Sequence, residues 1–175
     1  PGAVDVHTHL ELESNGICSA DDYFAGTRAA ACGGVTTIFD FVTQEHGEGI
    51  LAAVARRRLL CAPKACVDYA FHVALTDLTP EVLAEFSAAA KEGITSYKIY
   101  MVYRSRNMMM NDADIYQALQ RAKETGTIIE IHAENPDVID RNIEQFQKEG
   151  KLSAWYHYLS RPEAVEAEAD IRVIH

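Results

Sequence analysis

Short apolar stretches alternate with longer stretches of helical periodicity along this chain of 175 residues. The segment from Val35 to Val42 is the clearest apolar stretch, because it is rich in β-branched residues, as a buried strand often is. Regular alternation is typical of a parallel sheet whose strands are joined by helices in right-handed crossovers. The predicted strands cover residues 3–10, 35–42, 66–75, 95–103 and 127–134.

Residues that favour helix ends mark the helices between these strands. Thr79 followed by Pro80 is typical of a helix start, with the threonine as cap and the proline at the first position. Glycines at positions 126 and 150 stand where helices are expected to end. The predicted helices cover residues 19–31, 49–60, 79–93, 112–125, 136–149 and 161–175.

The five strand–helix units are compatible with two architectures. One is an open, doubly wound sheet, and the other is the first part of an eight-unit barrel. A complete barrel takes about 250 residues. A chain of 175 residues would therefore hold about five of its units. Periodicity alone leaves both architectures open.

The composition argues against two classes of partner. The formal net charge is −10, whereas a nucleic-acid-binding surface needs an excess of basic residues. No apolar run reaches the roughly 18 residues of a membrane-spanning helix. The arginines at 56–58 fall in a helical pattern, and we expect them to form a solvated helix face. An apolar fraction of 48% is enough for a buried core.

The start of the chain and its cysteines bear on its context. The sequence begins with Pro1 and has neither an initiator methionine nor a signal peptide, so we expect it to begin inside a longer protein. Cysteines stand at 18, 32, 61 and 66, without a Cys-x-x-Cys pair. We expect buried or half-buried thiols in a reducing, cytoplasmic setting.

Three predicted strands end in polar residues, and the ends of strands are where α/β folds place their ligand sites. His7 and His9 stand two apart at the end of the first strand, so their side chains point to the same face. Two imidazoles at this spacing can bind one metal ion such as zinc. The alternative is a pair of surface histidines at a strand end.

Lys98 interrupts an apolar strand, in the sequence Ser-Tyr-Lys-Ile-Tyr. A buried lysine is costly unless it is paired or neutral. One interpretation is an aliphatic stem that carries the ammonium group to the strand end. The other is a neutral amine that reacts with carbon dioxide to form a carbamate, an anion able to bridge two metal ions.

His132 lies in the fifth predicted strand, and the period of two puts it on the same face as Glu130 and Glu134. In a barrel this polar face would point inward, although a core histidine satisfied by a neighbour has the same pattern. A His-x-His pair, a buried lysine and this histidine together indicate a metal site more strongly than each alone. We expect the remaining histidines to be structural, namely His46, His72, His157 and His175.

Taken together with their flanking sequences, these residues show that the chain resembles the hydantoinase/dihydropyrimidinase branch of the amidohydrolase superfamily over essentially its whole length. The most specific matches are the lysine-bearing strand at 96–103 and the sequence His-Ala-Glu-Asn at 132–135. The other matching segments are 2–9, 20–27, 33–38, 156–157 and 160–162.

The resemblance implies a TIM-type (β/α)8 barrel, of which this chain would hold about five βα units as one partial domain, residues 1–175. It also implies two divalent metal ions, usually zinc. His7 and His9 would bind the more buried ion, and His132 would bind the outer one. A carboxylated Lys98 would bridge both ions.

The activity that the resemblance implies is hydrolysis of a small cyclic amide, a hydantoin or a dihydropyrimidine. A hydroxide bridging the two metals would attack the ring carbonyl. Tyr103, five residues after the lysine, would hydrogen-bond the carbonyl oxygen as negative charge develops on it. A cytoplasmic homotetramer is the assembly that the resemblance implies.

Parts of the family pattern belong to segments other than residues 1–175. These parts are a further metal histidine, a proton-shuttling aspartate and a small β-sandwich. We therefore expect residues 1–175 alone to be catalytically inert, to bind metal weakly and to aggregate. The loop at 11–16 lacks the Pro-Phe pair with which many relatives line the substrate pocket. Which cyclic amide is accepted, and with which stereochemistry, stays open.

A non-catalytic scaffold is the alternative from a different class, as in the dihydropyrimidinase-related cytoskeletal proteins. Those relatives generally lack the metal ligands. This chain has a ligand at each of the family positions that it covers, which favours the enzyme. Metal content would distinguish the two interpretations.

Overall fold

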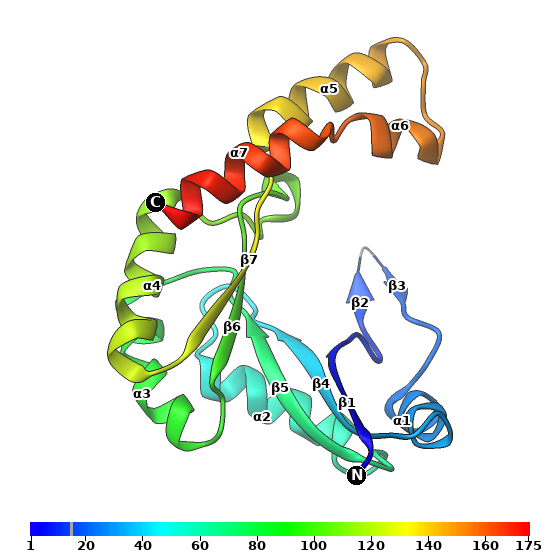
Figure 1. The fold of residues 1–175 in the computed structure, drawn as a ribbon, viewed down its shortest axis with the longest axis vertical. Coiled ribbons are helices and arrows are strands. Elements are labelled where there is room, and N and C mark those ends of the chain that lie inside the picture. Colours follow the sequence, from blue (N-terminus) through cyan, green and yellow to red (C-terminus); the bar gives the residue numbers. More distant parts are fainter. Residues whose placement is uncertain (15) are drawn as a thin grey trace.

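The computed structural model describes residues 1–14 and 16–175. Its centre is a sheet of five parallel strands that lie side by side in chain order. Figure 1 shows that this sheet curls, with its inner face open on one side. The strands are β1 (Ala3–Thr8), β4 (Val35–Thr43), β5 (Asp68–Ala74), β6 (Ser96–Tyr100) and β7 (Ile128–His132).

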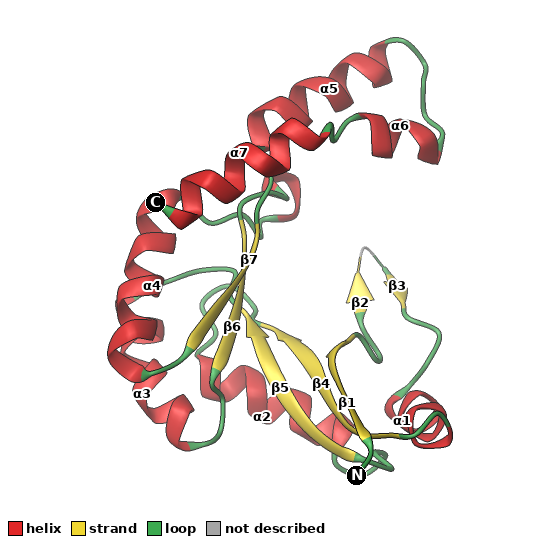
Figure 2. Ribbon diagram, viewed as in Figure 1, coloured by secondary structure: helices red, strands yellow, loops and turns green. Residues whose placement is uncertain are grey.

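Helices alternate with these strands and leave the inner face of the sheet open. The helices between residues 50 and 125 cover the outer face, and those between residues 136 and 174 rise beyond the end of β7 as an arm (Figure 2). This arrangement confirms the prediction of a partial (β/α) barrel over that of an open doubly wound sheet. The helices are α1 (Tyr23–Cys32), α2 (Ile50–Cys61), α3 (Pro80–Lys91), α4 (Asp112–Thr125), α5 (Pro136–Lys148), α6 (Ala154–Leu159) and α7 (Glu163–Ile174).

Local sequence explains where the helices begin and end. The Asp22 carboxylate accepts a hydrogen bond of 2.8 Å from the Ala25 amide at the start of α1. Thr79 caps α3 in the same way, and Pro80 fills the first helical position, as predicted. Gly126 ends α4 with a φ of 68°, a left-handed conformation that costs glycine little.

The core lies between the outer face of the sheet and the helices. Phe86 of α3 stacks on Tyr97 of β6 with 4.1 Å between the ring centroids. Ile99 of β6 is buried in the same cluster. Because side chains alternate along a strand, this packing turns Lys98 toward the inner face of the sheet.

Three features differ from the predicted elements. The strand predicted at 95–103 ends at Tyr100, and a 3₁₀ turn, η1 (Arg104–Arg106), follows Tyr103. A small antiparallel hairpin joins β2 (Glu13–Ser14) to β3 (Ile17–Cys18), and α6 precedes the last helix. The hairpin strands and α6 are too short to produce a recognisable periodicity. Of the predicted loop at 11–16, Asn15 lies outside the described residues.

The cysteines are free, and only Cys61 is buried. The expectation of buried thiols is therefore wrong for Cys18, Cys32 and Cys66, which are exposed. No helix in the described part of the chain is long and apolar enough to cross a membrane.

Both edges of the sheet are open. Within the described residues, β1 pairs only with β4, and β7 pairs only with β6. Apolar side chains stand on both edge strands, since Val6 is 60% exposed and Ile128 is 65% exposed. Unpaired edges that carry apolar side chains favour association with other chains.

We predict that residues 1–175 expressed alone associate through these edges. Size-exclusion chromatography with light scattering should find oligomers or aggregates at micromolar concentration. Replacing Val6 with Lys places a charge on the β1 edge and should shift the distribution toward the monomer. A stable monomer of the unmodified segment at these concentrations would contradict the prediction.

Candidate functional site

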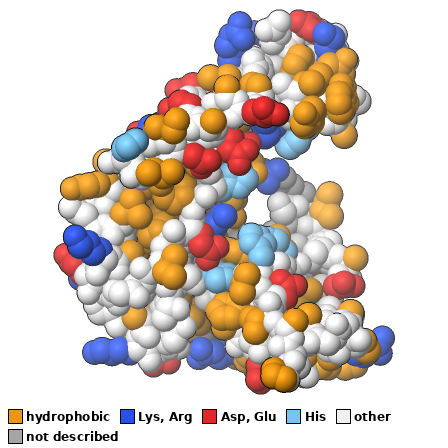
Figure 3. Space-filling view, viewed as in Figure 1, with side chains coloured by type: hydrophobic (Ala, Val, Ile, Leu, Met, Phe, Trp, Pro, Cys, Tyr) orange, Lys and Arg blue, Asp and Glu red, His pale blue; other side chains and the backbone are white. Residues whose placement is uncertain are grey.

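A cavity of about 310 Å³ opens on the inner face of the sheet. It is bounded by β1, β2, β4, β6, the segment after β6 and the end of β7. Figure 3 shows histidine side chains gathered along the hollow between the arm and the rest of the molecule. All five residues predicted for the site line this cavity: His7, His9, Lys98, Tyr103 and His132.

His7 of β1 and His9, just after the end of that strand, form a close pair. Their ring centroids are 5.1 Å apart, in an edge-on arrangement. Phe41 of β4 lies against both rings, with centroid distances of 4.5 Å to His7 and 4.9 Å to His9. Partial burial, followed by the neighbouring His7, lowers the pKa of His9. The lowered pKa favours the neutral imidazole, the form in which histidine binds a metal.

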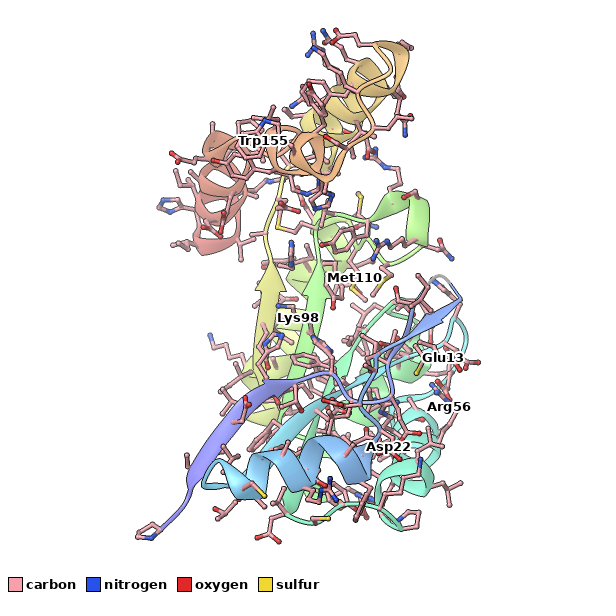
Figure 4. The ribbon with its side chains drawn as sticks, turned by 90° about the vertical axis from the view of Figure 1, so that its right-hand side faces the viewer. Glu13, Asp22, Arg56, Lys98, Met110 and Trp155 are labelled. Atoms are coloured by element: carbon pink, nitrogen blue, oxygen red, sulfur yellow. The ribbon has the colours of Figure 1, made fainter. Side chains whose placement is uncertain are left out.

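Lys98 is half-buried and is the middle residue of β6. In Figure 4 it lies between the lower part of the molecule, which holds Arg56, and the arm that carries Trp155. Its register partner on β7 is Glu130. The Glu130 carboxylate lies 2.9 Å from the Nδ1 atom of His72. The Lys98 ammonium nitrogen lies 5.8 Å from the centre of the Tyr100 ring. The amine therefore faces the cavity beside aromatic side chains.

His132 is the last residue of β7, at the far wall of the cavity from β1. Its Nε2 atom lies 3.2 Å from the Glu134 carboxylate. The Arg161 guanidinium approaches the other oxygen of that carboxylate at 3.4 Å. A carboxylate that engages one ring nitrogen fixes the orientation of an imidazole and leaves the other nitrogen available for a ligand.

Tyr103 lies three residues beyond the end of β6, with a φ of 69°. A left-handed conformation is uncommon for a tyrosine, and here it turns the chain into η1. The Tyr103 ring centroid lies 5.4 Å from that of His132 and 5.5 Å from that of Tyr100. The Arg106 guanidinium lies 5.0 Å from its ring centroid. The phenol thus stands at the cavity wall beside His132.

Among residues 1–14 and 16–175, no three His, Cys, Asp or Glu side chains come together as a group that could hold a metal ion. The predicted set is spread over separate elements. His7 lies on β1 and His9 follows the end of that strand, whereas Lys98 lies on β6 and His132 on β7. A lysine becomes a metal ligand only after it acquires an anionic group. Metal binding by this set therefore stays a prediction.

The sequence did not reveal a buried ion pair beneath the histidine pair. Asp40 of β4 is fully buried, and its carboxylate lies 2.9 Å from the guanidinium of Arg57. The expectation that the arginines at 56–58 form a solvated face is wrong for Arg57, which is also buried. The signal available was an aspartate inside an otherwise apolar strand, which needs a buried partner.

His72 also makes more contacts between strands than the sequence suggested. It is buried, and its Nε2 atom lies 2.9 Å from the carbonyl oxygen of Val6, next to His7. Its Nδ1 atom contacts both Ser96 and Glu130. His72 therefore connects β1 with β6 and β7 across the inner face.

Comparisons with known proteins agree over nearly the whole chain. A model of the amidohydrolase family matches residues 1–174. A D-hydantoinase from Ralstonia pickettii is 42% identical over 174 residues, which is 99% of this chain and 38% of that protein. A dihydropyrimidinase from Rattus norvegicus is 39% identical over 99% of this chain and 34% of that protein.

Solved structures give the same result for the fold. The crystal structure of a dihydropyrimidinase from Brevibacillus agri has a TM-score of 0.95 at 40% identity, covering 99% of this chain and 38% of that one. The chain thus spans a little over a third of the length of the relatives that it matches.

Proposed function

This chain belongs to the amidohydrolase family, and we propose that the protein containing it is a metal-dependent hydrolase that opens the ring of hydantoins or dihydropyrimidines. The observation that carries the proposal is the gathering of His7, His9, Lys98, Tyr103 and His132 around one cavity. Similarity to D-hydantoinases and a dihydropyrimidinase supports a cyclic amide as the substrate.

The proposed metal ligands are His7 and His9 for the more buried ion and His132 for the outer ion. The chemistry of the donors supports this assignment. The lowered pKa of His9 favours its neutral imidazole, and Glu134 occupies only one ring nitrogen of His132. Zinc is the proposed metal, because imidazole suits it well. Two such ions, when bound, would acidify a water molecule and polarise the amide carbonyl.

Lys98 is proposed to bridge the two ions as a carbamate. The neutral Nζ amine attacks carbon dioxide, a nitrogen–carbon bond forms, and the nitrogen releases a proton. The product carries one negative charge on two oxygens, which is the ligand chemistry of a carboxylate. The position supports this role, since Lys98 faces the cavity that both His7 and His132 line, while Glu130 is engaged by His72.

Tyr103 is proposed to act on the substrate itself. In ring opening, water adds to the carbonyl carbon, the bond from carbon to ring nitrogen breaks, and the nitrogen takes up a proton. Negative charge develops on the carbonyl oxygen in the transition state. A phenol at the cavity wall can donate a hydrogen bond to that oxygen.

The remaining parts of the proposal concern the whole protein. A non-catalytic scaffold is disfavoured, because each family ligand position within this chain is occupied by a residue of the required type. A homotetramer in the cytoplasm is proposed, and the four free cysteines support a reducing compartment. Residues 1–175 alone are proposed to be inert, since the family's remaining metal ligand and general base belong to other segments.

Replacing Lys98 with Ala in the full-length protein should remove the bridge. We predict that the metal content falls from about two ions per chain to one or fewer, with loss of hydrolysis of hydantoin and dihydrouracil. Elemental analysis after desalting measures the metal, and loading with ¹³C-bicarbonate should give a carbamate NMR signal that the variant lacks. Lys91→Ala, at an exposed position of α3, is the matched control. Two tightly held ions in the Lys98→Ala protein would contradict the proposal.

The Tyr103→Phe variant tests the role of the phenol. We predict that kcat falls about 100-fold or more, as expected for the loss of one donor to a developing oxyanion, while KM and metal content change little. Tyr116→Phe, at a tyrosine of α4 that is 62% exposed, should leave kcat unchanged. The proposed role is wrong if Tyr103→Phe turns over as fast as the parent enzyme.

A further inference from the structure

Asp40 lies in β4 directly beside the end of the strand that carries the histidine pair. Its register partner on β1 is Thr8, between His7 and His9. The Asp40 side chain is buried, and one carboxylate oxygen accepts hydrogen bonds from the Thr8 hydroxyl at 3.3 Å and from the Leu10 amide at 3.2 Å. The carboxylate therefore holds the chain on both sides of His9.

Arg57 completes the contact from α2. It pairs with the second oxygen of Asp40 at 2.9 Å and donates hydrogen bonds to the carbonyl oxygens of Leu10 and Glu11, the latter at 3.1 Å. Tyr23 of α1 donates its hydroxyl to the same carboxylate, and the Arg57 guanidinium lies 4.9 Å from the Tyr23 ring centroid. Three elements thus converge on one short segment, residues 8–11.

We propose that Asp40, Arg57 and Tyr23 form a positioning cluster that fixes His7 and His9 for metal binding. The inference rests on the proposed function, because it needs these histidines to be ligands. None of the three residues lines the cavity around His7 and His9, so we infer that they act through segment 8–11 and do not touch the metal or the substrate.

The position of β1 explains why such a cluster matters. The pairing register of β1 against β4 shifts between Asp5 and Thr8, the stretch that contains His7. Backbone pairing therefore constrains the strand end weakly. Metal ligation requires the donor atoms to be held within about 0.5 Å of their working geometry. The bonds from Asp40 and Arg57 supply that constraint at the point where the ladder is irregular.

The energetics of the ion pair between Asp40 and Arg57 also support a positioning role. A buried ion pair contributes little net stability, because removing two charges from water offsets their mutual attraction. Its directional bonds nevertheless define one geometry for segment 8–11. Phe41, the next residue of β4, packs against the rings of both His7 and His9. Adjacent residues of β4 thus fix the backbone and the side chains of the histidine pair.

The test is zinc affinity in the full-length protein, measured by competition with a chromophoric chelator. Asp40→Asn keeps the shape of the side chain but removes the charge, and it should weaken zinc binding about 10- to 100-fold. Saturating zinc should restore most of kcat, since no group that touches the substrate has changed. Tyr23→Phe removes one hydroxyl from the cluster and should weaken binding by a smaller factor. Arg56→Gln, the neighbouring exposed arginine that pairs with Glu48, is the control and should bind zinc normally.

Three comparisons decide the outcome. The proposal is overturned if the Asp40→Asn protein melts at a lower temperature but binds zinc as tightly as the parent protein. The role of Asp40 would then be structural only. If Asp40→Asn does not fold, unchanged zinc affinity in Tyr23→Phe overturns it. His7→Ala separates this inference from the proposed function. If His7→Ala keeps its zinc, the proposed ligand set is wrong, whereas loss of zinc there with normal binding in the cluster variants removes only the positioning role.

Discussion

The site depends on the alternation of side chains along β6, which places apolar residues on the face toward the helices and the lysine on the face toward the cavity. Tyr97 and Ile99 face the helices and are fully buried, with Tyr97 stacked on Phe86 of α3. This packing fixes the pleat of the strand, and the pleat leaves Lys98 no direction except the inner face. A slip of one residue would bury the lysine among the helices and remove it from the cavity.

The sequence predicted the frame of the molecule well, because strand–helix alternation and helix caps are local signals. Thr79 with Pro80 and Gly126 lie where predicted, and the five parallel strands follow in chain order. Interactions between distant segments were harder to predict. The register of β1 against β4 brings Thr8 beside Asp40, and no pattern within either strand announces that pairing.

The candidate site was likewise predicted only in part. The spacing of His7 and His9, the lysine in an apolar strand and the family resemblance were enough to name the residues that line the cavity. The groups that support them were not predicted. Arg57 looked like one of three surface arginines because its partner, Asp40, lies 17 residues earlier on another element. His72 looked unremarkable because its partners are spread over three other strands.

In the complete protein, we propose that His7, His9, Lys98 and His132 hold metal ions. X-ray diffraction from crystals of the full-length protein, collected on both sides of the zinc absorption edge, tests it most directly. We predict two anomalous peaks in the cavity, one about 2.0–2.1 Å from nitrogen atoms of His7 and His9 and one at the same distance from His132, with Lys98 bridging them as a carbamate. Zinc-loaded crystals with no anomalous peak beside these residues, or with an unmodified Lys98 between two bound ions, would contradict it.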